Sequence, residues 1–316
     1  MTLSGLSADR ILALHQAAKD SGALISVEEM LLLLPEHASE GELVLAISTM
    51  PALSSRLELR SGFITEKSAD QRDSALSAES NSRARAVSNI RWARRFAPLI
   101  AGGSMRLIAI SGSSSYRSAS RSTDLDFFCV SRTGALWLQL ARLLLLARAF
   151  RLTNRQSPEV CFSCMMDERY ATEAFSRERG SLFARDALQT VVVDGEGSYQ
   201  RLLRRAGWIS ALYPTLYAKR LDRSVSESGT VRKQSPAASA LNAFLYVMLG
   251  SYIRVKSFLR NRRLSKQGRA EDLFDLLIGQ DHLMLESARY RRLRESYGQA
   301  DVPSEVAGAV TPGART

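Results

Sequence analysis

The stretch RLIAISGSSSYRSASRSTDLDFFCV, residues 106–130, decides the fold expected for this chain. An apolar run ends in Gly112-Ser113, a loop rich in serine and arginine follows, and a second apolar run opens with Asp124-Leu-Asp126. Alternate residues of a strand point to the same face, so the two carboxylates are expected to project together. The pattern therefore predicts two strands joined by a polar loop, with paired carboxylates where the second strand begins.

Paired carboxylates beside a Gly-Ser turn are typical of a site for a metal-bound triphosphate. Carboxylate oxygens suit Mg²⁺ or Mn²⁺, and a Gly-Ser turn before a helix offers N–H groups and a hydroxyl to phosphate oxygens. We therefore predict Asp124 and Asp126 as catalytic residues and metal ligands, with an NTP as substrate. The predicted phosphate-binding residues are Gly112, Ser113, Arg117 and Arg121. For the two arginines, a solvated position in the loop is an equal alternative.

These residues resemble the polymerase-beta-like nucleotidyltransferase superfamily, whose signature is Gly-Ser or Gly-Gly, a polar spacer and Asp-apolar-Asp. Gly112, Ser113, Asp124 and Asp126 match it residue by residue, whereas residues 116–118 lack the second glycine usual in this loop. The resemblance implies transfer of an NMP from an NTP to a hydroxyl, phosphate or amine acceptor, with release of pyrophosphate. More loosely, most of the chain resembles bacterial nucleotidyltransferase-domain proteins of poorly defined substrate, so the acceptor, whether a small molecule, RNA or protein, stays open.

Many members of the superfamily carry a third carboxylate on the strand after the Asp pair. The corresponding run here, residues 160–166, has none inside it. Glu159 and Asp167 flank this run, Asp194 ends a later apolar run, and Ser163 is an alternative occupant of the position. The sequence does not choose among them. Two other functions therefore stay open, a catalytically degenerate nucleotide-binding scaffold and a nucleic-acid-binding module.

An α+β protein is expected, with a small mixed sheet and helices forming a nucleotidyltransferase fold. The expected segments are a winged-helix-like domain (1–68), a basic helical connector (69–102), the nucleotidyltransferase core (103–208), a helical domain (209–298) and a disordered tail (299–316). In the helical domain, residues 236–266 are expected to form the core of a bundle, with a basic patch at their end. His282 and Glu286 are expected one turn apart on a helix.

The N-terminal segment shows clear signals for helix starts. Ser26 and Ser39 are predicted N-caps, and Glu42 completes a capping box with Ser39. Two short strands are expected around Ser61-Gly62. The third helix, GELVLAIST, has no basic or amide side chain to meet bases or phosphates, so a structural or protein-contact role is favoured over DNA binding.

Composition sets the remaining expectations. The net charge of +11 favours polyanionic partners such as NTPs or RNA, or simply a basic surface. Three cysteines (Cys129, Cys161 and Cys164) favour a reducing compartment and buried thiols over a disulfide framework or zinc site. The N-terminus lacks a signal-peptide pattern. Residues 135–150 are short for a membrane span and include arginines. A cytoplasmic protein without a membrane partner is therefore expected.

Overall fold

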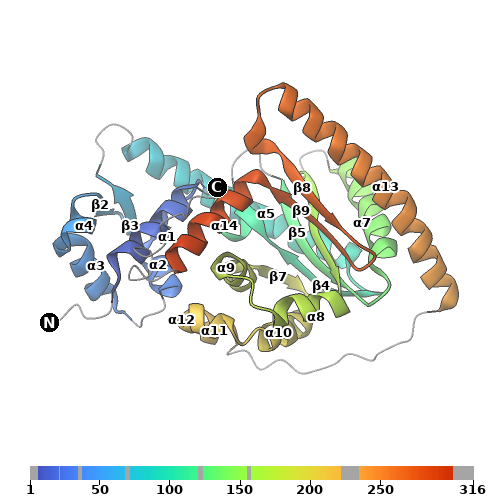
Figure 1. Ribbon diagram of the computed structural model, residues 1–316, viewed down its shortest axis with the longest axis horizontal. Coiled ribbons are helices and arrows are strands. Elements are labelled where there is room, and N and C mark those ends of the chain that lie inside the picture. Colours follow the sequence, from blue (N-terminus) through green and yellow to red (C-terminus); the bar gives the residue numbers. More distant parts are fainter. Residues whose placement is uncertain are drawn as a thin grey trace, which may run out of the picture.

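The computed structural model describes residues 6–20, 22–34, 38–67, 72–119, 124–154, 158–221 and 235–301. Arg121 of the predicted phosphate loop and the predicted tail beyond residue 301 lie outside these ranges. The described residues form a mixed α+β structure, as the sequence predicted, with a small N-terminal sheet and a larger central sheet (Figure 1).

The N-terminal part combines short helices with a three-stranded antiparallel sheet of order β1-β3-β2. Both predicted N-caps and the predicted capping box of Ser39 with Glu42 are confirmed, and Ser26 forms a second capping box with Glu29. The elements are α1 (Ala8–Asp20), β1 (Ile25–Ser26), α2 (Val27–Leu33), α3 (Glu40–Thr49), α4 (Pro51–Ser54), β2 (Leu57–Arg60) and β3 (Phe63–Glu66).

The central sheet has six strands in the order β7-β4-β5-β6-β9-β8. Only the β5–β6 pair is parallel, and the other neighbours are antiparallel. The strands predicted around residues 106–110, 125–130 and 160–166 are confirmed. The bounds are β4 (Met105–Ile110), β5 (Leu125–Ser131), β6 (Val160–Asp167), β7 (Val191–Asp194), β8 (Phe274–Ile278) and β9 (His282–Ser287).

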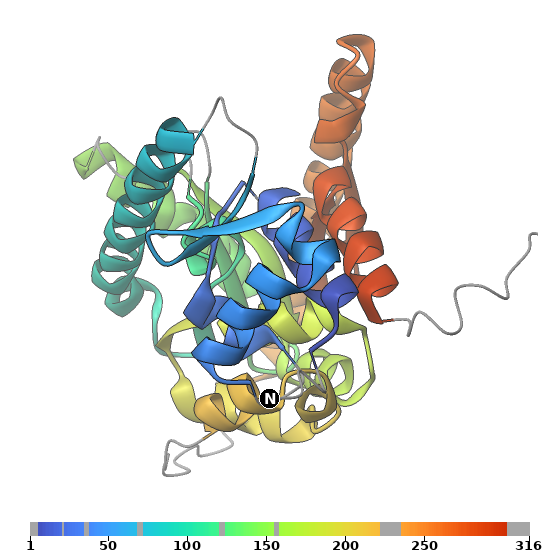
Figure 2. The same ribbon diagram turned by 90° about the vertical axis from the view of Figure 1, so that its left-hand side faces the viewer.

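Helices cover both faces of this sheet (Figures 1 and 2). The long helices α5, α7 and α13 pack on one face, and the shorter helices of the 168–221 region lie on the other together with α14. The bounds are α5 (Arg72–Ile100), α6 (Gly112–Ser115), α7 (Leu136–Thr153), α8 (Glu168–Ser176), α9 (Ser181–Gln189), α10 (Glu196–Arg205), α11 (Ile209–Leu212), α12 (Pro214–Leu221), α13 (Pro236–Lys266) and α14 (Ala288–Asp301).

The two-residue period of β5 divides the core into two hydrophobic clusters. Leu125, Phe127 and Cys129 lie in the cluster under α5 and α7. Phe128 and Val130 lie in the other cluster, which continues without a break into the N-terminal helices. Side chains of the N-terminal segment and of the central sheet therefore belong to one hydrophobic cluster.

The predicted helical domain is wrong over residues 274–287. Two strands form there instead, and β9 pairs with β6 through contacts such as Met166↔His282. His282 and Glu286 consequently lie on a strand rather than on a helix. The physical reason is the free edge of β6. Its backbone groups need partners, and a hairpin that turns at Gly279 supplies them.

Helix α13 is also not the core of a bundle. Its inner face packs on the sheet through side chains such as Tyr246, Leu249 and Ile253. Its outer face stays uncovered, as Figure 1 shows along the right-hand edge of the molecule. Within the described residues α13 is the one helix long and apolar enough, by length and composition alone, to cross a membrane.

Asn242 of α13 caps α7 from outside that helix. The N-cap residue of α7, Ala135, has no side-chain acceptor. Instead, the buried Asn242 Oδ1 accepts hydrogen bonds from the backbone N–H groups of Trp137 at 2.9 Å and Leu138 at 3.1 Å. These are two of the amides that a helix start leaves without an intrahelical partner.

We expect Asn242→Ala to lower the free energy of unfolding by about 2–4 kcal/mol, since it leaves two backbone N–H groups without a hydrogen-bond acceptor and opens a small cavity. Urea denaturation measures this difference. Asn81→Ala is the matched control, because Asn81 is exposed and donates to the carbonyl of Ser77 on its own helix. Equal stability losses in the two variants would contradict the capping role.

Candidate functional site

The Gly-Ser turn and the Asp pair meet at one edge of the central sheet. The backbone N–H of Ser111 donates to the carbonyl of Asp126 at 3.0 Å, and Ile110 pairs with Phe127. The end of β4 is therefore hydrogen-bonded to the beginning of β5. The antiparallel pairing of these two strands brings Gly112 next to Asp126, as the sequence pattern predicted.

Gly112 is required by both backbone conformation and space. Its φ is +65°, a region that side chains with a Cβ disfavour. A Cβ at this position would lie 2.7 Å from Oδ2 of Asp126, which is closer than real Cβ contacts allow. The turn thus places backbone directly against the carboxylate, and glycine is the residue that permits this approach.

The period of β5 sets the face of Asp126. Leu125 and Phe127 point into the cluster under α5 and α7, so Asp126 projects toward the opposite face. Asp124 precedes β5, and the charged groups around it include Glu159, Arg260 of α13 and Arg151 of α7. Asp124 is exposed and Asp126 is half-buried. That the two carboxylates share a face stays a prediction, and the charge of Asp124 contributes to the raised pKa of Asp126.

A β-bulge in β6 completes the surroundings of Asp126. Asp126 pairs with Cys161 and Phe128 with Cys164, so β6 has one extra residue in this interval. The Ser163 hydroxyl donates to Oδ1 of Asp126 at 3.2 Å, and the Cys161 thiol is also hydrogen-bonded to this carboxylate. Ser163 thus stands on the neighbouring strand where a third carboxylate was sought.

Both carboxyl groups are held closer to neutral than in water. Burial raises the pKa of Asp126 to about 6, against the effect of the Ser163 hydrogen bond and with a further contribution from Asp124. Loss of hydration, and then the charge of Glu159, raises the pKa of Asp124. Carboxylates that repel one another are a donor set that a divalent cation would stabilise.

The structure separates the three candidates for a third carboxylate. Glu159 precedes β6 at the site edge, where its carbonyl accepts from Leu125 N–H at 2.7 Å. Its carboxylate pairs with Arg151 at 2.8 Å and lies close enough to Asp124 to raise the pKa of that group. Asp167 lies at the opposite end of β6 and caps α8 by accepting from Tyr170 N–H at 2.9 Å. It is thereby committed to a structural role.

Asp194 is the third candidate and also lies away from the site. Strand β7 runs antiparallel to β4, so Val191 pairs with Ile110 at the site edge and Asp194 pairs with Ile108 farther along. The Asp194 side chain is exposed. Among the three acids, Glu159 alone contacts the Asp pair within the described residues.

Arg260 is a site residue that the sequence did not single out. It lies on α13 and stacks on Phe274 at 4.4 Å from the ring centroid. Its positive charge partly opposes the rise in the pKa of Asp124 that loss of hydration and Glu159 cause. The sequence showed a basic patch in this part of the chain. Its proximity to Asp124 depends on the packing of α13 along the sheet, so local sequence signals could not find it.

The loop after α6 is anchored at several points. Ser114 is buried and accepts from Asn89 of α5 at 3.0 Å, and Ser82 of the same helix donates to the carbonyl of Ala119 at 2.9 Å. Arg117 is exposed and has a φ of +59°. This is the left-handed conformation that glycine adopts more readily, in the segment where the second glycine of the superfamily is missing.

A buried polar cluster connects this loop to the C-terminal helix. The hydroxyl groups of Tyr116 and Tyr290 both donate to the Asp186 carboxylate, the latter at 2.8 Å. Arg185 stacks on Tyr116 at 4.5 Å from the ring centroid and donates to the hydroxyl of Tyr297. Through this cluster, α9 and α14 fix the position of the loop.

Cys161 and Cys164 lie on the same face of β6, because the bulge between them makes them pair with Asp126 and Phe128, two residues of β5 that share a face. Cys161 contacts Asp126, whereas Cys164 packs against the cluster that includes Phe128. Burial raises the pKa of both thiols to about 12. In the described part of the chain, no group of three or more His, Cys, Asp or Glu side chains is arranged to hold a metal ion.

Comparisons of this chain with protein families, curated proteins and solved structures found no relative. No protein-family model, no curated protein and no solved structure matches the chain. The fold and site define a mixed α+β protein with a Gly-Ser turn packed against a carboxylate pair at one sheet edge.

Proposed function

We propose that this protein is a metal-dependent nucleotidyltransferase of the polymerase-beta-like type. It would move an NMP from an NTP to a hydroxyl, phosphate or amine acceptor and release pyrophosphate. The observation that carries the proposal is the close approach of the Gly112 backbone to the Asp126 carboxylate, which leaves no room for a Cβ at Gly112. A backbone turn suited to phosphate thereby lies beside a carboxylate suited to Mg²⁺ or Mn²⁺.

The residues of the site fit this chemistry. Asp124 and Asp126 would hold a cation whose role, when bound, is to neutralise charge on the triphosphate in the transition state. The half-exposed Ser113, with the backbone of Gly112, is placed to meet phosphate oxygens. Arg117 and Arg260 supply positive charge from the loop and from α13.

The Ser163 hydrogen bond supports a second candidate function, a nucleotide-binding scaffold without catalysis. In that case the neighbouring strand would stabilise Asp126 through a hydroxyl and no carboxylate would activate the acceptor. The two candidates differ in whether Glu159 serves as the third acid.

A transfer assay separates them. Purified protein would be incubated with each α-labelled NTP, Mg²⁺ or Mn²⁺ and a cell extract. Label that appears with the wild type and not with the Asp124→Ala, Asp126→Ala double variant is the expected result, and its sensitivity to RNase or protease would define the acceptor class. Metal-dependent NTP binding without transfer would favour the scaffold, and the absence of both would reject the nucleotide site.

We expect Glu159→Gln to reduce transfer about a hundredfold while the protein stays folded, because a carboxylate that accepts the proton of the attacking group contributes at least that much. Initial rates at saturating NTP measure this. Asp194→Asn is the matched control, since its side chain is exposed and away from the pair. An unchanged rate in Glu159→Gln would remove this residue from the catalytic site.

A further inference from the structure

The outer face of α13 concentrates the exposed apolar surface of the protein. Half of the large apolar side chains that are exposed in the described part of the chain lie on this one helix. Phe244 is 59% exposed, Val255 58% and Phe258 65%. The other members are Leu241, Val247, Met248, Tyr252 and Leu259. These eight side chains are called the outer face below.

The outer face forms one continuous stripe. At about 100° per residue, its eight positions fall within an arc of about 140°. The inner side chains, such as Tyr246 and Ile253, point to the sheet on the other side of the helix. The stripe is therefore separate from the packing of α13 in the fold, and it leaves a second apolar face open to solvent.

The helix that carries this stripe has basic side chains and no acidic ones. Within Pro236–Lys266 there are basic residues and no Asp or Glu. The basic side chains are Arg254, Lys256, Arg260, Arg262, Arg263 and Lys266. No ion pair with an acidic side chain involves Arg262, Arg263 or Lys266 among the described residues, so these three cations are available to an external anion.

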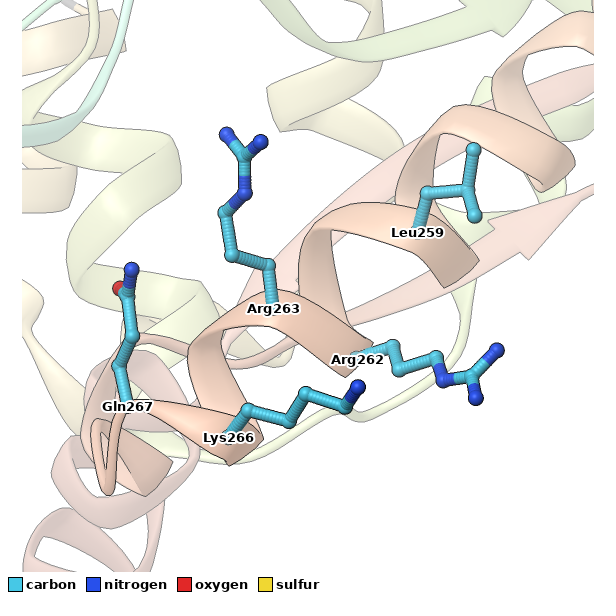
Figure 3. Close-up of a pocket in the computed structure, with 5 residues that line it drawn as sticks. All are labelled: Leu259, Arg262, Arg263, Lys266 and Gln267. Atoms are coloured by element: carbon cyan, nitrogen blue, oxygen red, sulfur yellow. The ribbon is translucent and has the colours of Figure 1, made fainter.

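The end of the stripe opens into a basic pocket. An open pocket of about 550 Å³ is lined by Leu259, Arg262, Arg263, Lys266 and Gln267. Figure 3 shows Arg262 and Lys266 projecting to one side of the helix and Arg263 to the other. Leu259 and three cations thus surround the end of the stripe at a shallow, open depression, and this brings apolar and positively charged surface together.

We propose that α13 docks this protein onto an anionic lipid surface. The outer face would lie at the boundary between acyl chains and headgroups, and Arg262, Arg263 and Lys266 would meet lipid phosphates. From the sequence we expected no membrane partner, because residues 135–150 are short for a membrane span and include arginines, and residues 236–266 were expected to be a bundle core. The exposure of the outer face changes that expectation.

Charge and side-chain type favour this occupant over two others. A second copy would bring another helix with six cations and no acid against the first, leaving the charges uncompensated. Single-stranded RNA would gain from aromatic stacking, but most of the outer face is aliphatic. An anionic lipid surface complements both the cations and the aliphatic side chains.

Vesicle co-sedimentation tests the proposal with the full-length protein. We expect binding to phosphatidylcholine vesicles that contain about 30 mol% phosphatidylglycerol, little binding to pure phosphatidylcholine, and weakening by high salt. The double variant Val255→Ser, Phe258→Ser should lose at least about tenfold in affinity. The triple variant Arg262→Gln, Arg263→Gln, Lys266→Gln should lose the preference for the anionic lipid.

The matched control is Val87→Ser, Leu99→Ser, because both side chains are exposed on α5 rather than on α13. It should bind vesicles like the wild type. Thermal unfolding should be unchanged in all variants, since the substituted side chains are exposed. The proposal is overturned by equal binding of the wild type and the double serine variant, or by absence of vesicle binding. It is also overturned if the wild-type protein is a dimer and the double serine variant is a monomer, or if the wild-type protein binds RNA and does not bind lipid.

Discussion

Asp126→Asn is expected to lower nucleotidyl transfer by more than about a hundredfold, since partners that merely orient a metal ligand are already worth 10–100-fold. Asparagine has nearly the same shape and can still accept the Ser163 hydrogen bond at Oδ1. It loses the negative charge that would hold the cation beside Gly112. The fold should therefore persist while the reaction is lost.

The experiment compares initial rates of label transfer, with circular dichroism and urea unfolding as measures of folding. Asp194→Asn removes one carboxylate from the same sheet at a position away from the site, so it should retain the wild-type rate. If Asp126→Asn transferred label at the rate of the Asp194 variant, the carboxylate pair would not be the catalytic centre.

Asp186→Asn is expected to raise the free energy of unfolding at pH 8 by about 2–4 kcal/mol and to leave it nearly unchanged at pH 4. Burial raises the pKa of Asp186 to about 7, although the hydrogen bond from Tyr290 opposes this. In the unfolded chain the carboxyl ionises near its ordinary value of 3.8. Between these values the folded protein binds the extra proton.

The direction of the pH effect follows from that proton. The stabilising contribution is complete below about pH 4 and is lost as the pH rises to about 7, so at pH 8 the wild type carries a buried charge. Asparagine carries none and can still hydrogen-bond to Tyr116 and Tyr290. The groups that face Asp186 also include Arg185, whose guanidinium stacks on Tyr116.

Urea unfolding from pH 4 to pH 8 measures this effect as a difference between the wild type and the variant, which cancels the titration of other groups. The exposed Asp194→Asn should show no such pH-dependent difference. A difference for Asp186→Asn that stays constant with pH would mean that Asp186 is already ionised in the folded protein at low pH.

Local sequence signals were sufficient for the edge of the site. A strand, a glycine turn and a second strand are specified by residues close in the chain, and the two-residue period of β5 sets the face of Asp126. The capping boxes at Ser26 and Ser39 were predictable for the same reason, because each joins residues three apart.

The sequence could not choose among Glu159, Asp167 and Asp194. Each is an acid at the end of an apolar run, and they differ in which end of a strand meets the Gly-Ser turn. The parallel pairing of β5 with β6 and the antiparallel pairing of β4 with β7 decide this. Strand direction across a sheet is a long-range property, so only the folded chain assigns Glu159 to the site edge.

The sequence by itself determined the α+β class, the strands around the site and the Asp pair, because these depend on periods and turns of a few residues. Tertiary structure decided that Asn242 caps α7, that Arg260 approaches Asp124, and that β9 joins the free edge of β6. It also decided that only one face of α13 is covered. An apolar helix has the same sequence pattern whether a partner lies on its second face or not, and contacts between residues a hundred positions apart determine the difference.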